Sequence, residues 1–129
     1  MLFRSRFLGQ RETLVYLLLK TGMPDHQIFA GVTLASVISV PGVGFDREQQ
    51  LRRLSAYLLD FVVCDRNMRI IAVVDMEAPG SADATGMERY KSDCLTAAGV
   101  RLVRINPMSL PPRDAIRGLI LGGPDAAGK

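Results

Sequence analysis

The chain has 129 residues, of which 48% are hydrophobic and 22% are charged, with a net charge of +3. This length and composition predict a single domain with one hydrophobic core, and they exclude a wholly disordered chain. No apolar run reaches the roughly 18 residues that a membrane span needs, and the N-terminal segment lacks the pattern of a signal peptide. We therefore expect a cytoplasmic protein without a membrane partner.

The first predicted element is a helix over Gln10–Thr21, where apolar residues recur at helical spacing before the stop signals Gly22 and Pro24. Glu12 lies in the first turn of this helix. It either turns toward the interior with the apolar face or complements the positive N-terminus of the helix.

A strand is predicted from His26, in an apolar run that continues to Val40, and a second helix from Asp46. Gln49 follows Asp46 by three residues, which resembles a capping box. The second helix is rich in arginine, which is a good bidentate ligand for phosphate. Three of its arginines are candidates for contact with nucleic acid, with an ordinary solvated helix face as the alternative: Arg47, Arg52 and Arg53.

Two strands are predicted next, over Leu58–Asp65 and Arg69–Glu77, and the link between them has turn chemistry. So short a link predicts an antiparallel hairpin. Apolar residues occupy both alternating sets of positions in the second strand, so we expect this strand to be central and covered on both faces. The period of a strand places Asp75 and Glu77 on the same side.

Asp60, Asp75 and Glu77 are carboxylates in an apolar setting, which costs free energy unless cations or hydrogen bonds compensate. Because an antiparallel pairing brings the start of one strand to the end of the other, Asp60 and Asp75 are expected to meet. Mg²⁺ or Mn²⁺ would suit such oxygen ligands, with Glu77 as a third ligand or as the group that orients a water. In the alternative, these acids simply begin and end their strands in water.

A small-residue loop over residues 80–86 precedes a third predicted helix, which begins at Met87 and stops at Gly99. Lys91 borders the apolar face of that helix; its amine either reaches the carboxylates or extends into water. A fourth strand over Val100–Ile105 and a short helix after Pro112 complete a core over residues 10–121, with a frayed tail over 122–129.

The runs LLDFVVCD, IIAVVDME and RYKSDCLTAAGVRLVRI resemble the small restriction-endonuclease-like domains of the PD-(D/E)XK nuclease superfamily. In particular they are similar to a bacterial family of domains of unknown function whose members read roughly vDFvl, viELD and agipllRi. The resemblance implies an αβββαβ core of the α/β (α+β) class, with a mixed four-stranded sheet flanked by helices. It matches Asp60, Asp75 and Glu77 to the acidic motif, and Glu12 to an acid on the first helix.

Three positions depart from the pattern of this family. Glu77 stands where the superfamily has its lysine, so the amine would have to come from Lys91 on the neighbouring helix. The order of Asp75 and Glu77 is the reverse of the usual Glu-x-Asp, and the histidine that relatives carry after the motif is absent. Arg89, Lys91 and Asp93 fall where relatives have a polar cluster.

The resemblance implies a magnesium-dependent nuclease, with Asp60, Asp75, Glu77, Lys91 and Glu12 as catalytic residues. Nucleic acid, DNA more than RNA, would be the partner, and Arg89 would join the arginines of the second helix in contacting it. The alternative is a catalytically inactive module of the same fold that binds nucleic acid or a protein partner. A homodimer is a further expectation.

Overall fold

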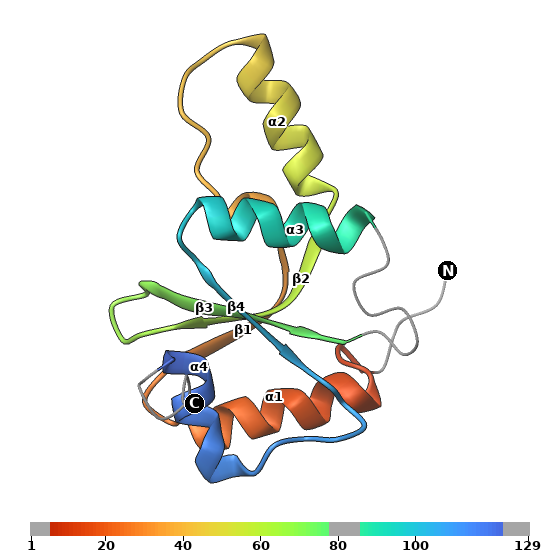
Figure 1. Ribbon diagram of the computed structural model, residues 1–129, viewed down its shortest axis with the longest axis vertical. Helices are drawn as coiled ribbons and strands as arrows, with labels where there is room; N and C mark the ends of the chain where they lie inside the picture. Colours follow the sequence, from red (N-terminus) through yellow and green to blue (C-terminus); the bar gives the residue numbers. More distant parts are fainter. Residues whose placement is uncertain (1–5, 78–85, 123–129) are drawn as a thin grey trace.

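The computed structural model describes residues 6–77 and 86–122. The elements follow the predicted order, as Figure 1 shows. Residues 80–85 of the predicted loop and 123–129 of the predicted tail lie outside the described residues. Within the described ranges, no helix has the length and apolar character needed to cross a membrane. The elements are α1 (Gln10–Gly22), β1 (Gln27–Thr33), α2 (Phe45–Ser55), β2 (Leu58–Cys64), β3 (Ile70–Met76), α3 (Gly86–Ala97), β4 (Arg101–Ile105) and α4 (Ile116–Leu121).

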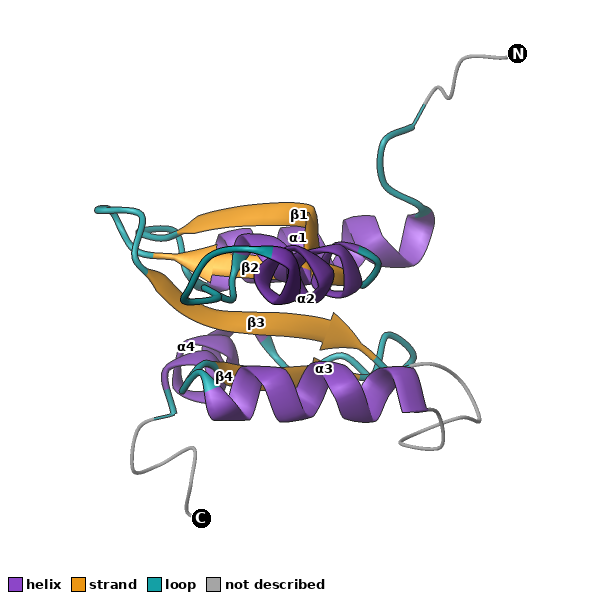
Figure 2. Cartoon of the chain, turned by 90° about the horizontal axis from the view of Figure 1, so that it is seen from above, coloured by secondary structure: helices purple, strands orange, loops and turns teal. Residues whose placement is uncertain are grey.

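The four strands form one mixed sheet in the order β1-β2-β3-β4, which Figure 2 shows from above. β1 with β2 and β2 with β3 are antiparallel pairs, whereas β3 with β4 is parallel. The predicted hairpin is therefore confirmed. The Asp65 carboxylate shapes its turn by accepting hydrogen bonds from the backbone N–H groups of Asn67 and Arg69, at 2.8 and 2.9 Å.

Hydrophobic residues pack on both faces of the sheet, so the molecule has three layers (Figure 1). α1 and α4 cover one face, where Val74 of β3 is fully buried. η1 (Leu34–Ser36) and α3 cover the other face, where Val73 is fully buried. α2 projects away from this face, and Leu54 near its end is its buried residue (Figure 1). β3 is thus a central strand covered on both faces, as its continuous apolar run predicted.

The capping box predicted at the start of the second helix is wrong. α2 begins at Phe45 with Gly44 as its N-cap, and no side chain caps it. Gly44 has φ 94° and ψ −160°, a backbone conformation that is open essentially only to glycine. The N-cap is therefore two residues before Asp46, so Asp46 lies inside the first turn, where it complements the helix dipole.

Candidate functional site

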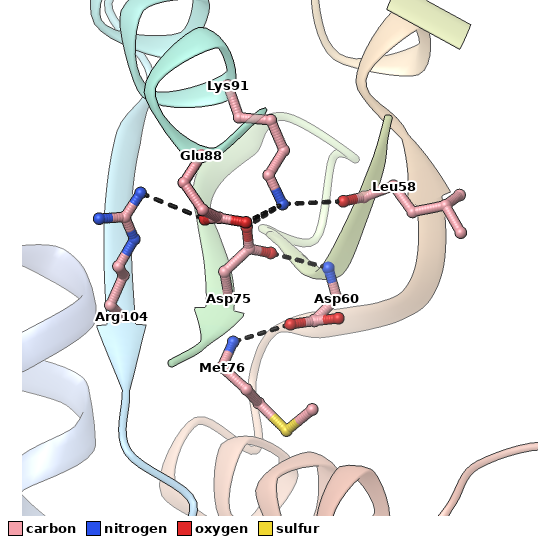
Figure 3. A network of polar contacts seen from close by, with 7 residues as sticks. All are labelled: Leu58, Asp60, Asp75, Met76, Glu88, Lys91 and Arg104. Carbon is pink, nitrogen blue, oxygen red and sulfur yellow. Dashed lines mark hydrogen bonds and ion pairs between the residues drawn. The ribbon is translucent and has the colours of Figure 1, made fainter. Parts of the chain in front are cut away.

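β2 and β3 part at one end, and this opening holds the central acids (Figure 3). β2 pairs with β3 from Phe61, opposite Val74, as far as Cys64. Before Phe61, β2 still pairs with β1, and after Val74, β3 still pairs with β4. We call the opening the β2–β3 fork. Asp60 and Asp75 lie in it, as the predicted hairpin required.

The carboxylates of the two aspartates in the fork accept hydrogen bonds from backbone N–H groups, in place of the carbonyls of a paired strand. The backbone N–H of Asp60 donates to Oδ1 of Asp75 at 2.8 Å. The backbone N–H of Met76 donates to Oδ2 of Asp60, also at 2.8 Å. Since buried backbone N–H groups need acceptors, each carboxylate satisfies a group that the parting strands leave without a ladder partner. Asp75 is only 2% exposed, so the alternative of strand-end acids in water does not hold for it.

Lys91 reaches the fork from α3 and is itself only 7% exposed. Its Nζ lies 2.9 Å from Oδ2 of Asp75 and 3.3 Å from Oε2 of Glu88. It also donates to the backbone carbonyl of Leu58 at 3.1 Å (Figure 3). The amine therefore reaches the carboxylates, and the alternative in which it extends into water is wrong.

Glu88 and Arg104 extend this network toward the edge strand β4. Nη2 of Arg104 lies 3.4 Å from Oε1 of Glu88. Sequence reasoning missed both residues, although each had a signal. Glu88 precedes Lys91 by three residues, a spacing that places two side chains together on a helix. Arg104 alternates with the buried residues Val103 and Ile105, so it points to the α3 face.

The fork shifts the acidity of two of its groups. Burial raises the pKa of Asp60; the Met76 N–H and the charge of Lys91 oppose this shift, and the charges of Asp75 and Glu12 add to it. Burial lowers the pKa of Lys91, but the hydrogen bond and charge of Asp75, together with Glu88, outweigh burial and raise it. Lys91 is consequently a fixed cation at neutral pH, and Glu12 of α1 acts on the fork through its charge.

A family of proteins of unknown function, DUF2726, matches residues 4–120, which is most of the chain. The chain belongs to the DUF2726 family. This confirms the expected relationship to a domain of unknown function and covers every residue of the fork. No curated protein and no solved structure matches the chain. The restriction-endonuclease-like core, the cytoplasmic location and the homodimer stay predictions.

Asp60 and Asp75 are the two fork residues of this DUF2726 domain whose carboxylates could hold a magnesium or manganese ion. Mg²⁺ usually takes one or two carboxylates and completes its shell with waters and phosphate oxygens. Asp60 and Asp75 supply such a pair. Among the described residues, no group of three or more His, Cys, Asp or Glu side chains is placed to hold a metal. Glu77, the predicted third ligand, is exposed beyond the end of β3, where its N–H donates to the carbonyl of Ile105 at 2.9 Å.

The arginines predicted to contact nucleic acid fall into two groups in the DUF2726 domain. Arg47 donates from Nε to a backbone carbonyl in the segment before α2, at 3.0 Å. Arg53 lies over the ring of Tyr90, 4.0 Å from its centroid. Arg52 and Arg89 are exposed. Two of the four arginines therefore have contacts within the chain, and a nucleic-acid partner stays a prediction.

Proposed function

We propose that this domain is a metal-dependent nuclease that hydrolyses phosphodiester bonds in nucleic acid, built on a restriction-endonuclease-like core. The observation that carries the proposal is the fork itself, in which Nζ of Lys91 lies 2.9 Å from the Asp75 carboxylate beside Asp60. The order of helix, three antiparallel strands, helix and parallel strand supports the core, with α2 as an addition between β1 and β2.

The residues of the fork would have different roles in the reaction. Asp60 and Asp75 would hold Mg²⁺ or Mn²⁺, and the bound ion would polarise a phosphoryl oxygen and lower the pKa of a water. Lys91 supplies a fixed positive charge that can stabilise the negative charge developing on the phosphate. Because its pKa is raised, Lys91 keeps this charge at neutral pH. Lys91 of α3 would thus take the role of the lysine that is missing from β3.

Cleavage assays with labelled DNA and RNA oligonucleotides test this proposal, with Mg²⁺ or Mn²⁺ added and with EDTA as the control. We expect cleavage, DNA before RNA, that falls by about 100-fold or more in Asp75→Asn and in Lys91→Met. Asp93→Asn, an exposed acid on α3, is the matched control and should cleave normally. Failure of the wild-type chain to cut any of these substrates would contradict the proposal.

A second candidate is a module of the same fold that binds nucleic acid without cutting it. It is favoured by the engagement of both oxygens of Asp75, one by a backbone N–H and the other by Lys91. It predicts binding that does not need a metal and weakens as salt rises. Fluorescence anisotropy of nucleic acid with the wild-type chain, Arg52→Gln and Arg89→Gln, measured across a salt series, would detect this binding. Binding that is absent at low salt would exclude it.

A further inference from the structure

The ammonium of Lys91 is surrounded by oxygens from three different elements (Figure 3). Oδ2 of Asp75 comes from β3 at 2.9 Å, the carbonyl of Leu58 from β2 at 3.1 Å, and Oε2 of Glu88 from α3 at 3.3 Å. We call these three atoms the Lys91 oxygens. A buried ammonium with two carboxylates and a backbone carbonyl around it fills the position that a free cation would take.

The Lys91 oxygens have the chemistry of a site for a hard cation. Calcium binds carboxylate and backbone carbonyl oxygens at roughly 2.3–2.6 Å. The distances to Nζ suit a hydrogen-bonded nitrogen instead, and each oxygen would have to move inward by roughly 0.5–1 Å to bind such an ion. Glu88 lies in the first turn of α3. Nη2 of Arg104 lies 3.4 Å from Oε1 of Glu88, and this contact keeps the Glu88 carboxylate directed at the fork.

The charges around the fork provide a second argument. Three carboxylates are joined in this network: Asp60, Asp75 and Glu88. Two cations oppose them, Lys91 and Arg104. With all of them ionised, the remaining charge is −1, which one divalent ion already neutralises. A second divalent ion would find no further charge to neutralise while Lys91 is in place.

We infer that Lys91 occupies a second cation position, so that the fork accepts at most one divalent ion and removal of the amine opens another divalent-ion site at the Lys91 oxygens. Two-metal hydrolases hold their ions about 3.5–4 Å apart, where the pair stabilises both the attacking and the leaving oxygen. In this fork, the tethered ammonium of Lys91 would take the place of one of the two ions. The limit of one ion rests on the proposed function, whereas the site opened by removing Lys91 does not.

Calorimetric titration of the whole chain with Ca²⁺ tests the inference by counting bound ions. We expect Lys91→Ala to bind one ion more than the wild-type chain. Adding Glu88→Gln should weaken that extra site by about tenfold or more, because it removes a charged ligand. Lys91→Met is the matched control, since its methyl end fills the space, and it should gain no ion.

The outcomes separate this inference from the proposed function. A wild-type chain that binds no ion would contradict the metal-dependent function, yet an ion gained by Lys91→Ala would still support the cation position. A folded Lys91→Ala chain that binds no more Ca²⁺ than the wild type would overturn the inference. So would an equal gain in Lys91→Met. If Lys91→Ala unfolds, Ca²⁺ should restore its circular dichroism spectrum, and a chain that stays unfolded with Ca²⁺ would also overturn it.

Discussion

Asp60 and Asp75 hold each other's strands at the β2–β3 fork. The N–H of Asp60 donates to Oδ1 of Asp75 at 2.8 Å, and the carboxylate of Asp60 accepts the N–H of Met76, the residue after Asp75, at the same distance. Both carboxylates are thus positioned by backbone atoms before any ligand binds. Since alanine would remove this support together with any chemistry, asparagine variants, which keep an oxygen acceptor, are the appropriate tests.

The ion pair between Lys91 and Asp75 is expected to contribute strongly to stability. Lys91→Met leaves the Asp75 carboxylate, which is 2% exposed, as a buried charge without its cation. We expect the free energy of unfolding to fall by about 3–5 kcal/mol. Urea denaturation followed by circular dichroism measures this loss.

Two further variants make the test of this ion pair specific. Combining Lys91→Met with Asp75→Asn should restore at least half of the loss, because the uncompensated charge is removed. Lys20→Met, on α1 at the other face of the sheet, should change the free energy of unfolding by no more than about 0.5 kcal/mol. A loss below about 1 kcal/mol in Lys91→Met would show that the pair contributes little.

Asp60 should make the stability of the fold depend on pH. Its folded-state pKa is raised mainly by burial, so the folded chain binds more protons than the unfolded chain between the two pKa values. The contribution of Asp60 therefore becomes less favourable as pH rises from about 4, the ordinary pKa of aspartate, through its folded pKa. Asp60→Asn removes this titration while its amide oxygen can still accept from Met76.

Urea denaturation of Asp60→Asn and the wild-type chain between pH 4 and pH 7 tests this dependence. As pH rises, the free energy of unfolding of Asp60→Asn should increase relative to that of the wild-type chain. Asp93→Asn, an exposed carboxyl on α3, serves as the control and should show no such trend. A difference that is constant with pH, or that moves in favour of the wild type, would contradict the raised pKa.

Glu77 should matter less than Asp60 for binding a metal ion. Its side chain is exposed beyond β3, whereas the carboxylate of Asp60 lies in the fork, where it accepts the N–H of Met76. In Mn²⁺ titrations followed by calorimetry, we expect Asp60→Asn to weaken binding by about tenfold or more and Glu77→Gln by less than about twofold. Equal losses in the two variants would support the third ligand that the sequence predicts.

Gly44, the N-cap of α2, should tolerate alanine poorly. Its φ of 94° and ψ of −160° are open essentially only to glycine, so Gly44→Ala should cost about 1–3 kcal/mol. Among the described residues, no atom lies within 4 Å of the place that a Cβ would take at Gly86, the first residue of α3, so Gly86→Ala should be neutral or stabilising by up to about 1 kcal/mol. Thermal unfolding compares the two variants, and equal effects would contradict the strain assigned to Gly44.

Much of the fold could be predicted because local patterns carry it. Helical spacing located α1 to within one residue, and turn chemistry at residues 65–67 predicted the antiparallel pairing of β2 with β3. The continuous apolar run of β3 predicted a strand buried on both faces, because each alternating set of its side chains is apolar. The capping box at Asp46 failed because a glycine conformation, which no side-chain pattern encodes, sets the start of α2.

The sequence by itself determined which carboxylates meet, since antiparallel pairing fixes Asp60 beside Asp75. Only the tertiary structure decided which cation joins them. Lys91 lies 16 residues after Asp75, and its reach depends on how α3 packs across the sheet, which sequence spacing does not fix. The carbonyl of Leu58 has no side-chain signal at all, so the three oxygens around the ammonium become apparent only when β2, β3 and α3 are assembled.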